Sequence, residues 1–466
     1  MEKNKMGIVP IPKLIISMSL PAIFAMLVQA MYNVVDSIFV SRISDTNNDA
    51  LTAISLAFPL QLIVIAVFVG LGVGMNANIS RKLGEKDHKS AVLIAEHGVV
   101  IGIFVYSIVA VLGTLFARDF FELFTNNTSV IDYATSYTSI IMIFAFGRIL
   151  GQVGMSVLQG TGEMIKPMIA MLIGAVLNII LDPILIFGLF GVPAMGIEGA
   201  AIATVIAQIT SMIFVWGVLF FGNNIIKPNL RSFKFKISIV KQILVVGIPV
   251  SIMQGLGSVM LTGFNLILSK YGDLAIDVMG SYFRLQSLVF MPVFGLSTGT
   301  MPIIGFNFGA KNKERLLAAI KFSTLVAVCF MTFCMLIFQI FPTALLGLYN
   351  ANARMLELGV PAFRTISLMF PFLGVSVILS TAFQGLGKAH YSLYISMIRQ
   401  LVILLPAAYI LGEIGGLRTI WFAFLIAEIF GVTMVLFLFR KTYTKSVKDW
   451  PLNVDEEKVI TNNEIE

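Results

Sequence analysis

The sequence has few charged residues. Of its 466 residues only 12% are Asp, Glu, Lys or Arg, and 58% are hydrophobic, whereas about a quarter of the residues of a typical soluble domain carry charge. Hydrophobic runs of twenty or more residues recur along the whole chain, and runs of this length are typical of membrane-spanning helices. The scarcity of charge excludes a soluble domain with a large core and predicts an all-α, polytopic membrane protein.

Cysteine and histidine are also rare. The two cysteines, Cys329 and Cys334, share one hydrophobic run at a spacing that suits neither a metal site nor a redox CxxC motif. Of the three histidines, His88, His97 and His390, two fall in predicted cytoplasmic loops. Neither a metal centre nor a catalytic triad can be assembled from so few groups. We therefore predict that the chain is not an enzyme and has no metal and no bound cofactor.

The hydrophobic runs, separated by turn residues and charges, predict twelve spans. The first run is too long for a signal peptide and lacks a small-residue cleavage site, so we expect it to remain as the first span. The predicted spans cover residues 14–42, 51–78, 91–117, 131–158, 165–190, 199–222, 242–269, 275–308, 316–340, 359–384, 390–411 and 417–439.

Basic residues gather on one side of these spans. The opposite loops contain only Arg42, Arg118, Lys270, Arg354 and Arg418. Because loops rich in Lys and Arg stay in the cytoplasm, we predict a multi-pass protein of the cytoplasmic (inner) membrane with both termini in the cytoplasm. The net charge of +7 follows mostly from this bias, and no nucleic-acid partner is expected. The basic residues of the cytoplasmic side are Lys3, Lys5, Lys13, Arg81, Lys82, Lys86, Lys89, Lys166, Lys227, Arg231, Lys234, Lys236, Lys241, Lys311, Lys313, Arg315, Lys388, Arg440, Lys441, Lys445 and Lys448.

The chain repeats itself at an interval of about 225 residues. The stretch "VLQGTGE" at 157–163 returns as "AFQGLGK" at 382–388, and "SRKLGEKD" at 80–87 returns as "NFGAKNKE" at 307–314. Six spans separate equivalent points, so the halves share one orientation and are related by a pseudo-two-fold axis along the membrane normal, as in alternating-access transporters. The predicted parts are an N-lobe at 1–222, a basic cytoplasmic linker at 223–241, a C-lobe at 242–440 and a disordered cytoplasmic tail at 441–466.

Ionisable residues inside the first half indicate an ion site. A charge at the bilayer centre costs at least about 2.5 kcal/mol, so Asp36 in the first span and Asp182 in the fifth are candidate functional groups. Tyr32 precedes Asp36, and Asn178 precedes Asp182, by one helical turn, so both polar pairs can face one cavity. We predict that these four residues and Thr204 bind a coupling ion, either H+ or Na+; a structural hydrogen-bonding role is the alternative.

Prolines and further polar residues complete the pattern. Pro21 and Pro183 lie within the first and fifth spans, where a proline removes a backbone hydrogen bond and permits a kink, and we expect both to act as hinges. Arg284 and Arg399 are expected to pair with acids or carbonyl oxygens inside the helix bundle. The residues assigned either to a pathway or to a structural role are Asn33, Arg148, Gln152, Arg284, Arg399 and Glu428.

Glu96 and His97 lie near the cytoplasmic end of the third predicted span, where we expect a solvated helix end. The 24 methionines and 38 phenylalanines are expected mostly to face lipid or to pack between helices. Some should line a cavity, because soft and flexible walls suit a pocket for varied apolar cations.

Several of these stretches together resemble the multidrug and toxic compound extrusion (MATE) family, over essentially the whole chain. They are "YNVVDS" in the first span, the "SRKLGEKD" and "QGTG" loops, "LNIILDPILIFG" in the fifth span and "GIEGAAIAT" at the start of the sixth. In the branch that resembles the DNA-damage-inducible protein F, the coupling acids lie in the N-lobe, which here implies Asp36 with Tyr32, Asp182 with Asn178, and Thr204. The other main branch has acids in helices seven, eight and ten, and this sequence has none in seven or ten.

The resemblance implies a secondary antiporter that exports cationic or amphipathic drug-like compounds in exchange for H+ or Na+. Its expected partners are small molecules and membrane lipid, and we expect a monomer. Two alternatives stay open. A lipid or lipid-linked sugar flippase of the same superfamily usually carries extra helices. Another twelve-helix secondary transporter, such as a major facilitator, would need a loop motif that "SRKLGEKDHK" matches poorly.

Overall fold

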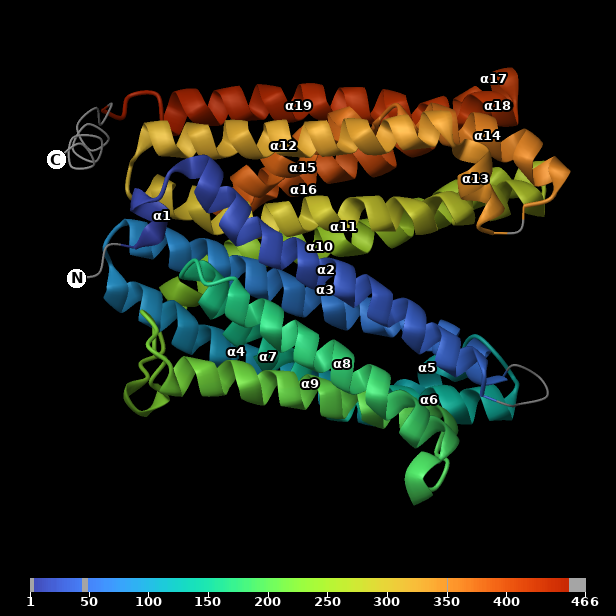
Figure 1. The fold of residues 1–466 in the computed structure, drawn as a ribbon, viewed down its shortest axis with the longest axis horizontal. Helices are drawn as coiled ribbons and strands as arrows, with labels where there is room; N and C mark the ends of the chain where they lie inside the picture. The colour runs from blue at the N-terminus through green and yellow to red at the C-terminus, as the bar shows by residue number, and fades with distance from the viewer. Residues whose placement is uncertain (1–3, 44–48, 350, 452–466) are drawn as a thin grey trace. The chain divides into compact units, whose positions relative to one another are not determined.

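The computed structural model describes residues 4–43, 49–349 and 351–451, and within these ranges the chain forms helices and no strand (Figure 1). This confirms the predicted all-α fold. The chain is helical because a backbone in lipid must form its hydrogen bonds within the protein, and a helix forms them within a single segment. The description excludes the side chains of Asn33, Val34, Ser37, Val40, Ser41, Leu51 and Ser232.

Ten of the described helices or continuous helical segments are long and apolar enough to cross a membrane, and two further helix pairs reach that length only together, so that twelve spans result if each pair counts as one. This count agrees with the prediction. The helices of the spans are α2 (Ile11–Ser41), α3 (Asp49–Gly84), α4 (His88–Leu115), α6 (Thr128–Ile143) with α7 (Phe146–Gly160), α8 (Ile165–Phe187), α9 (Gly196–Phe221), α10 (Ile237–Leu268), α11 (Asp273–Gly309), α12 (Lys313–Ile340), α14 (Ala353–Ser367) with α15 (Phe370–Gly385), α16 (Ala389–Met397) with the π-helix η4 (Ile398–Leu404) and α17 (Leu405–Gly415), and α18 (Leu417–Ile420) with α19 (Phe422–Ser446).

Short helices connect the spans. They are α1 (Lys5–Ile8), α5 (Ala117–Glu122) and α13 (Pro342–Gly347), with the 3-10 turns η1 (Leu189–Gly191), η2 (Leu230–Ser232) and η3 (Ser269–Tyr271).

Two spans are broken where the sequence predicts continuous helices. The α6–α7 pair bends by 42° and the α14–α15 pair by 46°. Pro371 at the start of α15 favours the second break, because a proline cannot continue the preceding helix. The first break falls at Phe144 and Ala145, and no proline explains it. The bends fall in the fourth and tenth spans, which the internal repeat makes equivalent.

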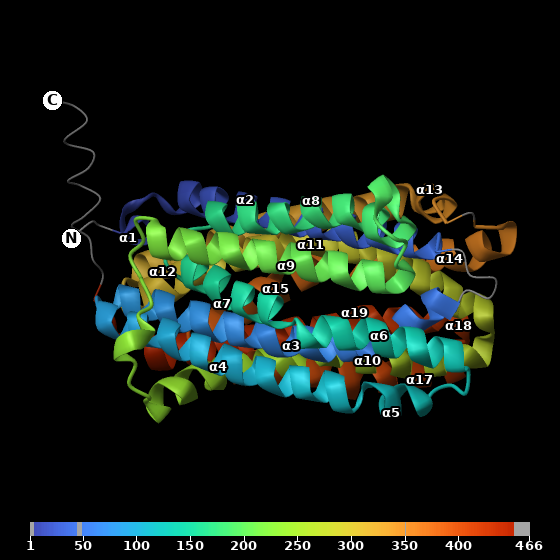
Figure 2. The ribbon, with the colours of Figure 1, turned by 90° about the horizontal axis from the view of Figure 1, so that it is seen from below.

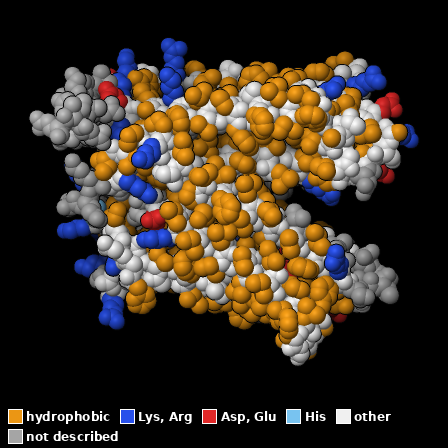
Figure 3. Space-filling model, in the orientation of Figure 1, with side chains coloured by type: hydrophobic (Ala, Val, Ile, Leu, Met, Phe, Trp, Pro, Cys, Tyr) orange, Lys and Arg blue, Asp and Glu red, His pale blue; other side chains and the backbone are white. Residues whose placement is uncertain are grey.

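Side chains at the surface follow the expected pattern for membrane helices. On the face drawn in Figure 3, hydrophobic side chains cover the middle of the helices, while Lys and Arg lie toward the helix ends. Large exposed hydrophobic residues such as Phe104, Phe220 and Phe437 are costly in water but not in lipid. The chain is therefore a multi-pass membrane protein.

Contacts within the chain divide it into two compact units. Unit 1 comprises Met1–Leu20, Ser80–Asp87 and Ile252–Glu466, and unit 2 comprises Pro21–Ile79 and His88–Ser251. The division falls inside α2 at Pro21 and inside α10 just after Pro249. The two lobes at 1–222 and 242–440 remain a prediction.

Glycines set the helix packing inside unit 2. Figures 1 and 2 both show α8 beside α9, and α7 also packs on α9. A Cβ atom on Gly147 would lie 2.8 Å from the Ile209 side chain, and one on Gly154 would lie 2.6 Å from Val215. These glycines let α7 approach α9 closely, as small residues do in membrane bundles. The close packing fixes the relative positions of polar residues on α7, α8 and α9.

The linker folds back onto α4 through two buried side chains of that helix. The Asn229 backbone N–H donates to Glu96 Oε1 over 3.1 Å, and the Lys236 backbone N–H donates to His97 Nε2 over 2.8 Å. Phe233 lies against the His97 ring at a centroid distance of 4.8 Å. The expectation of a solvated helix end is therefore wrong. Glu96 and His97 are 4% and 1% exposed, because they satisfy backbone groups of the linker.

In unit 1, the ends of α3 and α11 meet through a reciprocal glycine contact. A Cβ atom on Gly84 would lie 2.0 Å from the carbonyl oxygen of Phe306, and one on Gly309 would lie 2.0 Å from the carbonyl oxygen of Arg81. Each glycine thus packs on the backbone three residues before the other. Gly84 and Gly309 are equivalent in the internal repeat, so this contact explains physically why both are glycine.

Candidate functional site

The two predicted acids of the first half lie together in unit 2. Asp36 on α2 is half-buried and Asp182 on α8 is fully buried, and the two carboxyl groups lie close enough to interact electrostatically. Two neighbouring carboxylates repel each other unless a proton or a cation is bound between them. The pair is therefore suited to hold one proton or, with both groups ionised, a small cation.

Asn178 and Thr204 complete this acid pair. Asn178 lies one turn before Asp182 on α8, and its amide is 3.2 Å from the Thr204 hydroxyl on α9. When the amide nitrogen faces the carboxylate, it donates to Asp182 Oδ2 over 2.8 Å, and the amide oxygen accepts from the Thr204 backbone N–H over 3.1 Å. In this orientation both the amide nitrogen and the amide oxygen have a hydrogen-bond partner. The other Asp182 oxygen, Oδ1, is left without a donor among the described protein groups.

Tyr32 lies between the acids and a cationic side chain. Its phenol lies near the Thr204 side chain and interacts electrostatically with Asp36, Asp182 and Arg148. The five predicted ion-site residues are thus brought together by α2, α8 and α9. The helical spacing explains the pairs on α2 and α8, while Thr204 is added by packing.

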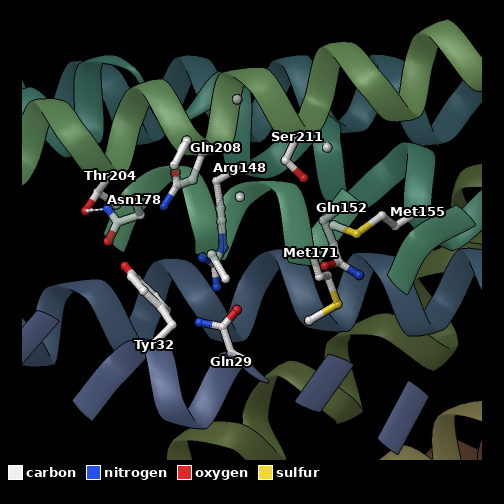
Figure 4. Close-up of a pocket in the computed structure, with 15 residues that line it drawn as sticks. Gln29, Tyr32, Arg148, Gln152, Met155, Met171, Asn178, Thr204, Gln208 and Ser211 are labelled. Atoms are coloured by element: carbon white, nitrogen blue, oxygen red, sulfur yellow. Dashed lines mark hydrogen bonds between the residues drawn. The ribbon is translucent and has the colours of Figure 1, made fainter. Parts of the chain in front are cut away.

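A pocket opens beside this cluster, with about 650 Å³ of empty space (Figure 4). Figure 4 shows Tyr32 and Asn178 at one end of the view and the sulfur atoms of Met155 and Met171 toward the other. Arg148 lies between these ends, and neither acid lines the pocket. The lining residues are Gln29, Tyr32, Gly147, Arg148, Gly151, Gln152, Met155, Met171, Gly174, Ala175, Asn178, Thr204, Ala207, Gln208 and Ser211.

Arg148 also borders a second pocket of about 500 Å³ in unit 2. Its guanidinium carbon lies 4.9 Å from the centre of the Phe68 ring. The residues around this second pocket are Gln61, Val64, Ile65, Phe68, Thr138, Ile141, Met142, Ala145, Arg148 and Gln208. Arg148 and Gln208 therefore belong to the walls of both pockets.

Some site residues were missed from the sequence. Gln29 and Gln208 line the first pocket, and the buried Tyr137 hydrogen-bonds Gln61 and interacts electrostatically with Asp36. The available signal was a polar side chain inside a hydrophobic run, but Gln and Tyr are common enough there that only the packing distinguishes them.

The remaining predicted residues have separate locations. Gln152 lines the first pocket and donates to Ser156 over 3.3 Å. Pro21 lies inside α2 and Pro183 inside α8, next to Asp182; their hinge role remains a prediction. The side chain of Asn33 lies outside the described residues.

The polar residues of the second half form a different arrangement in unit 1. Arg399 Nη1 lies 2.6 Å from Glu428 Oε2, and Ser376 donates to the other Glu428 oxygen over 2.6 Å. The predicted pairing of Arg399 with an acid is confirmed. The prediction for Arg284 is wrong among the described residues, because its side chain is exposed and its guanidinium lies 5.9 Å from the centre of the Tyr349 ring.

Comparison with known proteins places this arrangement in a family. The MatE family model matches residues 21–184 and again residues 249–410, in agreement with the internal repeat. The chain is 26% identical to the multidrug export protein MepA of Staphylococcus aureus, over 93% of this chain and 95% of MepA. It is 25% identical to an FAD transporter of Shewanella oneidensis, over 89% of this chain and 92% of that protein.

Solved structures agree with these relatives. An outward-facing structure of a multidrug resistance MATE family transporter of the MOP superfamily is similar to this chain with a TM-score of 0.89 and 27% sequence identity. The similarity covers 96% of this chain and 99% of that one.

Proposed function

The chain belongs to the MatE family, and on this premise we propose that it is an ion-coupled antiporter that exports drug-like amphipathic compounds across the cytoplasmic membrane. Support for the substrate class comes from its similarity to the multidrug export protein MepA over nearly the whole of both chains. We further propose that both termini are cytoplasmic and that the monomer is the functional unit.

The observation that carries the ion coupling is the proximity of the Asp36 and Asp182 carboxyl groups inside the membrane-spanning helices α2 and α8. In the proposed cycle, a proton or a sodium ion entering the pair neutralises charge that is costly inside the membrane. The loaded pair favours one arrangement of α2 and α8, and the unloaded pair favours the other. Pro21 and Pro183, each inside one of these helices, are the proposed hinges.

Exchange of substrate for ion requires that the binding of one changes the binding affinity of the other. Tyr32, Asn178 and Thr204 contact the acid pair or its partners and also line the 650 Å³ pocket. A ligand in the pocket and an ion on the acids thus share one wall of side chains. By linkage, each then changes the binding affinity of the other by the same factor.

The test is efflux of ethidium, measured as its uptake into inverted membrane vesicles that contain the protein, because the lumen of such a vesicle corresponds to the outside of the cell. Uptake is followed under a proton gradient alone and under a sodium gradient alone. Efflux under one gradient identifies the coupling ion. Vesicles that carry Asp36→Asn protein at equal expression should show no gradient-driven efflux. If neither gradient drives ethidium, or if the Asp36→Asn protein works normally, the proposal fails.

A further inference from the structure

Arg148 has a cationic side chain in a pocket whose lining, among the described residues, includes no carboxylate. It is half-buried on α7, within the α6–α7 pair, which together is long and apolar enough to cross a membrane. Within the described residues no acid forms an ion pair with it, whereas Arg81, Arg118 and Arg399 each have at least one acidic partner. A charge in such a place is costly unless a partner compensates it.

The known neighbours of Arg148 compensate it only in part. The Phe68 ring lies 4.9 Å from the guanidinium carbon on the side of the second pocket, where it can make a cation–π contact. Tyr32 interacts with the guanidinium electrostatically. Neither group is an anion when the phenol is protonated, so the guanidinium retains donors for a ligand in the first pocket.

The other polar groups around the pocket suit the same type of ligand. The amides of Gln29, Gln152 and Gln208 can donate hydrogen bonds, whereas the Ser211 hydroxyl donates to the Ala170 carbonyl oxygen. In Figure 4 the Arg148 guanidinium extends toward Gln29 and Tyr32, while Met155 and Met171 lie beside Gln152 and form a softer, apolar region. One end of the pocket can therefore bind a charged group of a ligand, and the other end can bind its apolar or aromatic part.

We propose that this pocket binds the anionic group, a carboxylate or a phosphate, of an amphipathic substrate, with Arg148 as its ion-pair partner. The proposal rests on the export function above and narrows its substrate class: the pocket prefers anionic or zwitterionic compounds to the cations that the sequence predicts. A guanidinium is well suited to this task, because its planar donors match both carboxylate and phosphate oxygens.

The test uses two dyes that differ in a single group. Rhodamine 110 has a free carboxylate, and rhodamine 123 is its methyl ester. Fluorescence polarisation with the purified full-length protein in nanodiscs measures the affinity for each dye. We expect the wild type to bind rhodamine 110 about 10- to 100-fold more tightly, the range for one charge-assisted hydrogen bond. Equal affinities, or tighter binding of the ester, overturn the proposal.

Substitutions at Arg148 test whether this residue causes the preference for rhodamine 110 over rhodamine 123. Arg148→Gln should remove the difference between the dyes, and Arg148→Lys should keep most of it. Arg354→Gln, which removes an exposed cation on α14 in unit 1, is the matched control and should behave as the wild type. If Arg148→Gln is folded and still prefers rhodamine 110, Arg148 does not bind the anion and the proposal is wrong.

Competition on the wild type remains decisive even if the Arg148 variants do not fold. Benzoate and phenyl phosphate present the two anions on the same ring, and benzamide is the neutral control. Displacement of rhodamine 110 by benzoate indicates a carboxylate substrate, and displacement by phenyl phosphate indicates a phosphate. Displacement by neither anion, or equally by benzamide, overturns the proposal. Ethidium transport in the inverted vesicles described above tests the export function separately, because a nanodisc has no interior and binding needs no gradient.

Discussion

At the scale of single residues, the acid pair depends on contacts between helices that are far apart in the sequence. The spacing of Tyr32 and Asp36, and of Asn178 and Asp182, predicts two polar faces because residues four apart share a helix face. It cannot show which partners those faces meet. Thr204 as the partner of Asn178 and Arg148 as the neighbour of Tyr32 required the packing of α7, α8 and α9.

Replacing Asp182 by Asn should uncouple ion from substrate. The amide keeps the size of the side chain and removes a buried ionisable group, so the protein should fold and insert. Substrate affinity, measured with and without the coupling ion, should change by a factor of about 5 to 150 in the wild type, the usual range of coupling free energies, and not at all in Asp182→Asn.

The control for this variant is Asp119→Asn, because Asp119 is an exposed acid on α5. It should retain the wild-type ion dependence. An Asp182→Asn protein whose substrate affinity still responds to the ion would remove Asp182 from the ion site.

At the scale of helices, span positions were predictable because a membrane demands long apolar runs. The breaks inside the fourth and tenth spans were harder to predict. Neither bend was predicted: Pro371 is a local signal for the bend before α15, whereas the bend at Phe144 has no local sequence signal. The burial of His97 likewise depends on where residues 229–236 return to α4.

The contact of α3 with α11 predicts a strong difference between two glycines of α11. In Gly309→Ala the new Cβ atom meets the Arg81 carbonyl oxygen, and overpacking of this kind costs about 1–3 kcal/mol. In Gly280→Ala nothing lies within 4 Å of the new atom, so helix propensity should instead stabilise by about 1 kcal/mol. Thermal unfolding in detergent measures both variants. Equal melting temperatures would contradict the tight contact.

The docking of the linker on α4 predicts that His97→Leu releases it. The Lys236 N–H then loses its acceptor, and an unpaired buried donor costs about 1–3 kcal/mol. Trypsin should cleave the linker, which contains Lys227, Arg231, Lys234 and Lys236, about fivefold faster or more. His88→Leu, at the first residue of α4, is the control. Unchanged cleavage of His97→Leu would show that this bond does not hold the linker.

At the scale of the whole molecule, the distribution of Lys and Arg predicts orientation, which helix geometry alone does not determine. In a variant with Cys329 and Cys334 replaced by serine, a membrane-impermeant maleimide applied to intact cells should label Asn126→Cys and leave Lys89→Cys unlabelled. Inverted vesicles should give the opposite result. Both positions are exposed, so labelling of the two from one side would contradict the predicted topology.

The reciprocal contact of Gly84 with Phe306 and of Gly309 with Arg81 has an evolutionary consequence. Residues that are equivalent in the repeat contact each other in both directions, which is the signature of an isologous interface between identical subunits. A single six-helix ancestor would have carried both surfaces of this contact and could have formed a homodimer through it. Joining two such copies in one chain would keep both halves of the contact, and each glycine would remain constrained by the backbone of the other copy.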